Sequence, residues 1–537
     1  MGESPTLAEA MVRDLAGWGV PVVFGVAGDD ILPLLDAFAR EGSPRYVAAT
    51  HEANAAFMAA AWGALTGQPG VCVAGAAGVV NLLEGLAEAA LDRVPVLALT
   101  GQLDTGKLGS RAKQYFNQQR VAAEFAVTTE LVADAPAGVR LLHQALAVAW
   151  LRRGVAHLSV PGDLWTRPVQ AVPSRRPALL GPPVSPGEVR GDVARAAALV
   201  RRARRPLLVL GREAAPAAEA ARRLGEAWGA AVVVAQDARG VVEESWPAVV
   251  GGVGEGWLPD LVGEADGVVL VGTASFEAGY LPRAPVIQVT ADPGEVAPAY
   301  LWDSVTGDPG VVLAGLAGAA AETEPDPAWQ ARIAAARRAW DELRAADLGR
   351  GDRPVHPARL MAELGAALPE DAVIALDEGA LGHWFARDFR AARQRVLLSA
   401  WWRNMGAGLP GALAAALAFP GRTAVAVTGD GGLLMSHGEL VTAVRYSLPV
   451  KVIVVRNGVY GLERDKAAQA ALKPVGLELA APDFRRYAES CGVAGFRVED
   501  PAELRPVLNQ ALSLAGPALV EVACADVRLP FPPAAGR

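Results

Sequence analysis

The stretch TAVAVTGDGG (residues 423–432) decides the fold of this chain, because it has the pattern of a buried strand that ends in a tight turn. Short, fully apolar runs of this kind are typical of parallel strands covered on both faces. A second strand, VKVIVVRNG (450–458), ends at Asn457, 27 residues beyond Asp430. If the two strands are neighbours in one sheet, Asp430 and Asn457 meet at one crevice beyond it. Oxygen ligands there suit Mg²⁺, and the glycine-rich backbone suits a phosphate.

The alternation of apolar strands with helical stretches recurs along the whole chain. Further strands are expected at 20–26, 70–75, 94–101, 205–211, 230–235, 267–272, 284–292 and 371–379. This pattern predicts an α/β fold of three consecutive domains, each with a parallel sheet flanked by helices. The expected domains are residues 1–168, 186–325 and 355–537. A Pro-rich stretch (166–188) and an acidic, then helical stretch (321–356) are expected to connect them.

Composition narrows the class of protein. The chain has 537 residues, of which 52% are hydrophobic, so several buried cores are expected. The net charge of −8 argues against a general nucleic-acid binder. The sequence shows no secretory signal and no run of 18 apolar residues free of charges and breakers, so a cytoplasmic protein without a membrane anchor is expected. Three cysteines without CxxC spacing suggest neither disulfides nor a zinc site.

Three segments together resemble the thiamine-diphosphate-dependent enzymes. They are GDGG followed by Asn457, THEANAAFMAAAWG (50–63) and NMGAGLPGALAAALAFPGR (404–422), and the resemblance covers nearly the whole chain in family order. It implies that Asp430, Asn457 and the carbonyl of Val459 bind Mg²⁺. It also implies a set of residues that bind thiamine diphosphate: Gly379, Ala380, His383, Met405, Gly429, Gly431, Gly432, Tyr460 and Gly461.

The same resemblance gives Glu52 a catalytic role. A carboxylate hydrogen-bonded to N1′ of the aminopyrimidine stabilises the imino tautomer, whose nitrogen can remove the C2 proton of the cofactor. Such a carboxylate works best in a dry site, and the apolar flank AAFMAAA fits that requirement. Met405 falls where the family places the bulky residue that holds the cofactor in its bent shape.

The reaction that follows decarboxylation is open at this stage. The C-terminal third resembles pyruvate oxidases most, and the substrate is expected to be a small 2-oxo acid such as pyruvate. In pyruvate oxidases and acetolactate synthases the central domain binds FAD, and the isolated glycines here leave FAD binding undecided. The enamine can be oxidised, can attack a second carbonyl or can be protonated. Asp29 and Glu463 fall where simple decarboxylases carry acidic residues, and Asn117 falls near the expected thiazolium.

The resemblance also implies an oligomer. In the family the two ends of the cofactor are held by different subunits, so a homodimer or homotetramer is expected. Two other classes of protein are less consistent with the sequence. A non-catalytic relative would be expected to lose Glu52, Asp430 or Asn457, and all three are present. A dinucleotide-dependent oxidoreductase would need GxGxxG after an early strand, and GVAGDD does not supply it.

Overall fold

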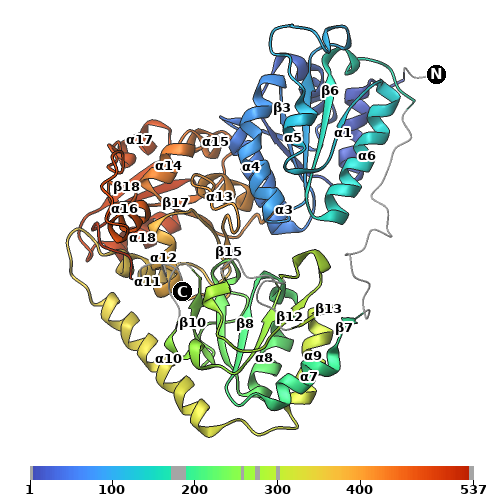
Figure 1. Ribbon diagram of the computed structural model, residues 1–537. Helices are drawn as coiled ribbons and strands as arrows, with labels where there is room; N and C mark the ends of the chain where they lie inside the picture. Colours follow the sequence, from blue (N-terminus) through green and yellow to red (C-terminus); the bar gives the residue numbers. More distant parts are fainter. Residues whose placement is uncertain (1–3, 171–188, 255–258, 273–277, 298–302, 531–537) are drawn as a thin grey trace.

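Three sheets, each built mainly of parallel strands, confirm the predicted α/β class (Figure 1). The computed structural model describes residues 4–170, 189–254, 259–272, 278–297 and 303–530. Most of the expected connector 166–188 lies outside these residues. The described residues at its start, 166–170, belong to the first domain. Pro168 forms an isolated antiparallel β-bridge with Thr6, and the Arg167 carbonyl accepts a hydrogen bond from the Leu7 N–H.

The first domain has six parallel strands in the order β2-β1-β3-β4-β6-β5. Its strands are β1 (Val22–Gly25), β2 (Arg45–Ala48), β3 (Gly70–Ala74), β4 (Val96–Gln102), β5 (Ala126–Leu131) and β6 (Val155–Pro161). Its helices are α1 (Leu7–Gly17), α2 (Leu32–Glu41), α3 (Glu52–Thr66), α4 (Val79–Leu91), α5 (Gln118–Ala122) and α6 (Ala135–Arg152). Three of these strands match expected ones. Strands β2, β5 and β6 were not anticipated. The half-exposed edge strands β2 and β5 lack a continuous apolar run, and His157 and Ser159 interrupt the apolar run of β6.

The third domain repeats this winding, with the order β15-β14-β16-β17-β19-β18. Its strands are β14 (Val373–Leu376), β15 (Arg395–Leu397), β16 (Ala424–Gly429), β17 (Lys451–Arg456), β18 (Ala494–Val498) and β19 (Ala518–Ala523). Its helices are α11 (Pro357–Ala367), α12 (Ala380–Asp388), α13 (Gly408–Ala418), α14 (Asp430–Ser436), α15 (Glu439–Arg445), α16 (Gly461–Gln469), α17 (Phe484–Ser490) and α18 (Leu504–Ser513). Helices α3 and α13 therefore hold the same topological position in their two domains.

The central sheet has the order β10-β9-β8-β11-β12-β13-β7, and its edge strand β7 is antiparallel to β13. The strands are β7 (Arg190–Gly191), β8 (Pro206–Leu210), β9 (Ala231–Ala235), β10 (Val249–Val253), β11 (Gly267–Val271), β12 (Val286–Thr290) and β13 (Asp303–Thr306). Helices α7 (Val193–Arg202), α8 (Ala218–Trp228) and α9 (Pro309–Ala320) cover it. The helix expected between the last two domains is α10 (Pro327–Leu348), whose Trp329 and Ile333 are buried in the central core.

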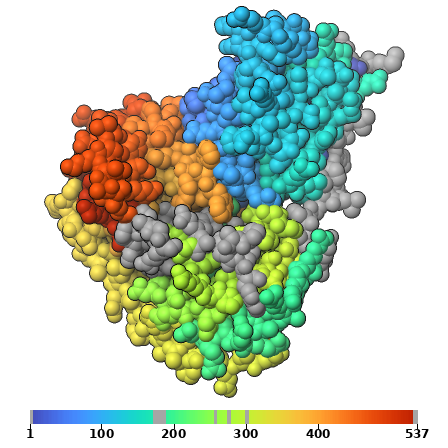
Figure 2. Space-filling model, in the orientation of Figure 1, coloured from blue at the N-terminus to red at the C-terminus, as the bar shows by residue number. Residues whose placement is uncertain are grey.

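The first and third domains share one hydrophobic core. Small side chains of α3, among them Ala55 and Ala59, belong to the same buried cluster as Leu409 and Ala412 of α13. Helix α3 is apolar almost all round, and a helix of that kind is stable only when it is covered on every side. The space-filling view accordingly shows the first and third domains in direct contact (Figure 2). Among the described residues, no helix is both long and apolar enough to span a membrane.

A close approach between α3 and β3 yields a stability prediction. A Cβ on Gly70 would lie 1.9 Å from the carbonyl oxygen of Ala59, so Gly70→Ala must push the helix from its sheet. We expect this variant to lower the free energy of unfolding by about 2 kcal/mol, measured by urea denaturation. Gly315→Ala is the control, because nothing lies within 4 Å of its Cβ on α9 and alanine favours a helix. Equal stability of the two variants would contradict the packing.

Candidate active site

The carboxyl ends of β16 and β17 form the predicted crevice. The two strands pair in parallel, with Gly429 opposite Val455, which confirms that Asp430 and Asn457 follow neighbouring strands. Asp430 is buried, and its carboxylate accepts from the N–H of Gly431 at 3.0 Å and of Gly458 at 2.7 Å. Burial raises the pKa of Asp430. A buried carboxylate of this kind, whose pKa is raised although Arg456 opposes the shift, is a group that a bound metal ion would stabilise.

One pocket collects most of the predicted cofactor residues. Its lining includes Gly379, Ala380, Met405, Gly429, Asp430, Gly431, Gly432, Asn457, Val459, Tyr460, Gly461 and Glu463. The pocket wall is crowded: a Cβ on Gly431 would lie 2.8 Å from the ring of Tyr460 and 3.2 Å from Cε of Met405. Gly379 has φ +132°, which side chains rarely allow. Glycines and oxygen ligands of this kind fit a Mg²⁺-bound diphosphate.

Glu378 also lines the pocket, and the sequence reasoning missed it. It follows β14, which pairs with β16, so the rule that found Asp430 could have found it too. Burial and the neighbouring Asp377 raise the pKa of Glu378 to about 8. Arg403 lies 3.3 Å from its carboxylate. The pocket therefore contains a carboxyl group that titrates near neutral pH and can serve as a proton donor or acceptor.

Glu52 is the first residue of α3 and lies at the carboxyl edge of the first sheet. Its Oε2 accepts from the Asn81 side chain at 2.9 Å, and a Cβ on Gly78 would lie 2.5 Å from its Oε1. The side chain is only half buried, so the dry environment expected from the apolar flank is not formed within one chain. Every described residue that lines the Asp430 pocket belongs to the third domain. Glu52 and this pocket are thus separate within one copy.

The remaining candidate catalytic residues differ in their placement. Asp29 is exposed after β1, whereas its neighbour Asp30 turns inward and accepts from the Ala76 N–H at 2.7 Å. Asn117 is exposed and caps α5 by accepting from the Arg120 N–H at 2.8 Å. Glu463 is exposed and lines the Asp430 pocket. The structure therefore brings Glu463 to the Asp430 pocket and leaves Asp29 and Asn117 on the first domain.

Family comparisons agree with this geometry. Models of the N-terminal TPP binding domain, the central domain and the C-terminal TPP binding domain of thiamine pyrophosphate enzymes match residues 5–124, 193–316 and 377–522. YdaP of Bacillus subtilis (strain 168), named as a thiamine pyrophosphate-containing protein, is 32% identical over 96% of this chain and 91% of its own length. The chain belongs to the thiamine-pyrophosphate-dependent enzymes.

Two further relatives of this thiamine-pyrophosphate-dependent enzyme carry names that state a reaction. Pyruvate oxidase of Lactiplantibacillus plantarum is 28% identical, over 94% of this chain and 86% of its own length. The large subunit of acetolactate synthase isozyme 1 of Escherichia coli (strain K12) is 27% identical, over 96% of this chain and 93% of its own length. The family is therefore shown, whereas the names of these two relatives state different reactions.

The central domain of this family member has a carboxylate where a dinucleotide would lie. The direction in which successive strands are added to its sheet reverses between β8 and β11, and open α/β sheets bind ligands at such a point. There Glu213 accepts from Thr290 Oγ1 at 2.7 Å and from the Ala291 N–H at 3.0 Å. A Cβ on Gly272 would lie 2.6 Å from Cβ of Glu213, so Glu213 fills the space. Since a diphosphate needs free N–H donors and no facing carboxylate, the described part of this crevice does not fit FAD.

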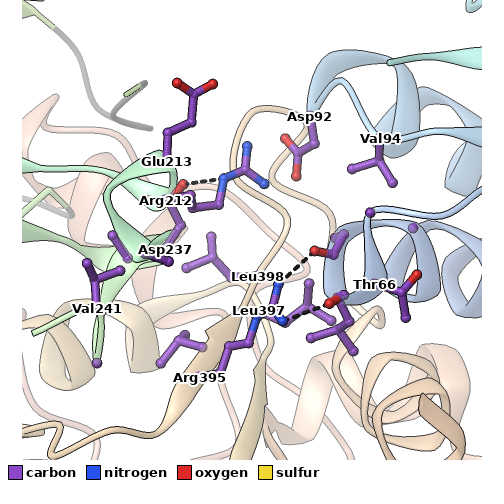
Figure 3. A pocket seen from close by; sticks show the side chains of 18 of the residues that line it. Thr66, Asp92, Val94, Arg212, Glu213, Asp237, Val241, Arg395, Leu397 and Leu398 are labelled. Carbon is purple, nitrogen blue, oxygen red and sulfur yellow. Dashed lines mark hydrogen bonds and ion pairs between the residues drawn. The ribbon is translucent and has the colours of Figure 1, made fainter. Parts of the chain in front are cut away.

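A cavity of about 700 Å³ lies where the three domains meet (Figure 3). Among the described residues, none of the predicted site residues lines it. Arg212 pairs with Asp237 at 3.1 Å on the central-domain side, and Arg395 of β15 donates to the carbonyls of Leu65 and Ala64 at 2.7 and 3.0 Å. The Arg395 contacts join the third domain to the first, whereas the Arg212–Asp237 pair lies within the central domain.

His383, predicted as a pocket residue, does not line the Asp430 pocket and is buried behind it in α12. Burial, with a contribution from Lys466, lowers the pKa of His383 to about 4. The folded state therefore keeps the ring neutral down to that pH, whereas the unfolded chain takes up a proton near the ordinary value of about 6.5. The contribution of His383 to the free energy of unfolding is fully present above about pH 6.5 and is lost as the pH falls from about 6.5 towards 4.

A variant can isolate this contribution. Between about pH 7 and pH 5, wild type should lose about 2 kcal/mol more unfolding free energy than His383→Asn, as measured by urea denaturation. His157, whose pKa burial also lowers to about 4, remains in both proteins and provides a common background. If the two proteins lose the same free energy over this range, His383 is not held neutral by the fold.

Proposed function

We propose that this enzyme uses thiamine diphosphate and Mg²⁺ to decarboxylate a small 2-oxo acid such as pyruvate. The observation that carries the proposal is the pocket in which Asp430, Asn457 and Val459 meet a glycine-lined wall. Asp430, the Asn457 side chain and the Val459 carbonyl would hold the metal ion. Gly379, Ala380, Gly431 and Gly432 are among the residues that would admit the diphosphate, and Met405 and Tyr460 would border it.

Thiamine diphosphate, when bound, supplies the carbon nucleophile and the electron sink that decarboxylation requires. The protein contributes position and proton control. Glu52 would hold a proton at N1′ of the aminopyrimidine, the role that the family resemblance gives it. Glu378 would exchange a proton near neutral pH at the third-domain pocket, because burial and Asp377 raise its pKa to about 8.

A second copy of the chain would complete the site. Glu52 is half buried, and its neighbour Val80 is 56% exposed. On the third domain Met435 and Val441 are 53% and 44% exposed. Apolar side chains that project from α4, α14 and α15 are typical of a surface that another subunit covers. We therefore propose a homodimer or homotetramer in which Glu52 of one copy faces the Asp430 pocket of another.

For the step after loss of CO₂ we propose a reaction without flavin. The carboxylate of Glu213 occupies the crevice where a dinucleotide would lie in the central domain. Transfer to a second carbonyl compound, as the name acetolactate synthase implies for the relatives, is then the first candidate. Protonation by a nearby acid is the second candidate, because the carboxyl group of Glu463 lines the Asp430 pocket.

Substitution of Glu52 tests the proposed chemistry. Glu52→Gln should lower turnover of pyruvate at least about 100-fold, because the amide cannot share a proton with N1′. Binding of thiamine diphosphate should stay near the wild-type level in the presence of Mg²⁺ and be lost after removal of the metal. The matched control is Glu219→Gln on the exposed face of α8, which should retain full activity. A fully active Glu52→Gln enzyme would refute the assigned role.

The visible spectrum tests the flavin-free proposal. Purified protein should show no flavin absorption, and added FAD should keep its free fluorescence, because Glu213 excludes the diphosphate. Glu213→Ser, which removes the carboxylate, should bind FAD more tightly than wild type does. Stoichiometric flavin in the wild-type protein would overturn the proposal and favour an oxidase.

A further inference from the structure

Glu439 is a fully buried carboxylate at the boundary between the first and third domains. It is the first residue of α15, three residues after the helix α14 that begins at Asp430. Its Oε1 accepts from the Thr50 N–H at 2.8 Å, from Thr50 Oγ1 at 2.5 Å and from Asn54 Nδ2 at 2.9 Å. Its Oε2 accepts from Thr442 Oγ1 at 2.6 Å. Four donors are what an ionised carboxylate can satisfy.

The three donors on Oε1 all belong to the segment that carries Glu52. Thr50 lies two residues before Glu52 and Asn54 lies two residues after it. Glu439 therefore accepts hydrogen bonds from residues on both sides of the proposed catalytic residue. Neighbouring contacts hold the same segment. A Cβ on Gly438 would lie 2.9 Å from Thr50 Oγ1, and the Tyr446 hydroxyl accepts from the Ala48 N–H at 2.7 Å.

Charge explains why a carboxylate suits this place. The N-terminal end of a helix carries a partial positive charge and its C-terminal end a partial negative charge. Glu439 faces the start of α3, and Arg395 donates to the Leu65 and Ala64 carbonyls at the end of the same helix. Two ionic side chains of the third domain thus complement the two ends of α3. Of these two side chains, only Glu439 contacts residues within one helical turn of Glu52.

We propose that Glu439 is a positioning residue that fixes the place of Glu52 for its reaction with the cofactor. The inference rests on the proposed function of Glu52. Glu439 lies shortly after α14, the helix that begins at Asp430. Its hydrogen bonds therefore connect the proposed metal-binding region to the start of α3 within one chain. If it is lost, the Thr50 and Asn54 donors have no acceptor there, and the first turn of α3 can shift. A displacement of about 1 Å at a reacting group can cost on the order of 100-fold in rate.

Three substitutions of Glu439 distinguish the effect of side-chain length from the effect of charge. Glu439→Gln keeps an acceptor oxygen at the same distance, and its turnover number should stay within about threefold of wild type. Glu439→Asp keeps the charge but is one methylene shorter, and Glu439→Ala has no acceptor. Both should lose about 30-fold or more in turnover number. The KM for pyruvate should change little in all three, because Glu439 lines no described pocket.

Amide hydrogen exchange gives a readout that does not depend on activity. In the cofactor-free, full-length protein the Thr50 N–H should exchange slowly in wild type and in Glu439→Gln, and fast in Glu439→Asp and Glu439→Ala. Arg395→Met is the matched control at the other end of α3. It should lower the unfolding midpoint while leaving Thr50 exchange and the turnover number near wild type. Thr442→Val, which removes only the donor from within α15, should behave like wild type in both respects.

The outcomes are distinct. Slow Thr50 exchange and normal turnover in Glu439→Asp would overturn the proposal. A low turnover number in Glu439→Gln with slow Thr50 exchange would also overturn it, because the position of the segment would then be kept while activity is lost. If Glu439→Ala does not fold, the Gln and Asp variants decide the question. Failure of the proposed function has a different signature, namely wild-type protein without thiamine-diphosphate-dependent turnover, or a fully active Glu52→Gln enzyme.

Discussion

Helix α3 packs against helix α13 through small side chains, and the rest of the structure depends on this contact. Alanines of α3 and the alanines and leucines of α13 form one buried cluster that includes residues of both flanking sheets. Two helices can approach closely only where side chains are small, and each helix here is covered by its own sheet on one side and by the other helix on the other. The first and third domains therefore form one body with a shared core.

This packing fixes where the chemical groups lie. Because the two domains have the same strand order, α3 and α13 are equivalent elements, and Glu52 and the Asp430 pocket lie on separate parts of the joined body. Each site is incomplete alone: Glu52 is half buried, and the Asp430 pocket is lined by described residues of the third domain only. A second copy would supply what each lacks. The same logic explains why apolar side chains of α4, α14 and α15 remain exposed.

Charged groups buried at the domain boundaries add specificity to this packing. A buried carboxylate is costly unless hydrogen bonds satisfy it, and Glu439, Glu213 and Asp430 each accept at least two. Apart from Gly431 and Thr442, their partners come from other segments of the chain, so each carboxylate favours a single arrangement of these segments. Burial raises the pKa of Asp430 and of Glu213, and burial together with the neighbouring Asp377 raises that of Glu378. Groups of this kind are the ones suited to proton transfer.

The sequence by itself predicted the apolar strands that end near Asp430 and Asn457, their parallel pairing and the meeting of these two residues, because period and strand ends are local features. It did not identify the edge strands β2 and β5, which have no continuous apolar run, nor the buried strand β6. It named Asp29 and not its neighbour Asp30, whose side chain turns inward. Only the tertiary structure decided that Glu213 fills the central crevice and that Glu439 accepts hydrogen bonds from the segment around Glu52. These contacts join residues up to hundreds of positions apart, and their geometry arises only when the three sheets are packed.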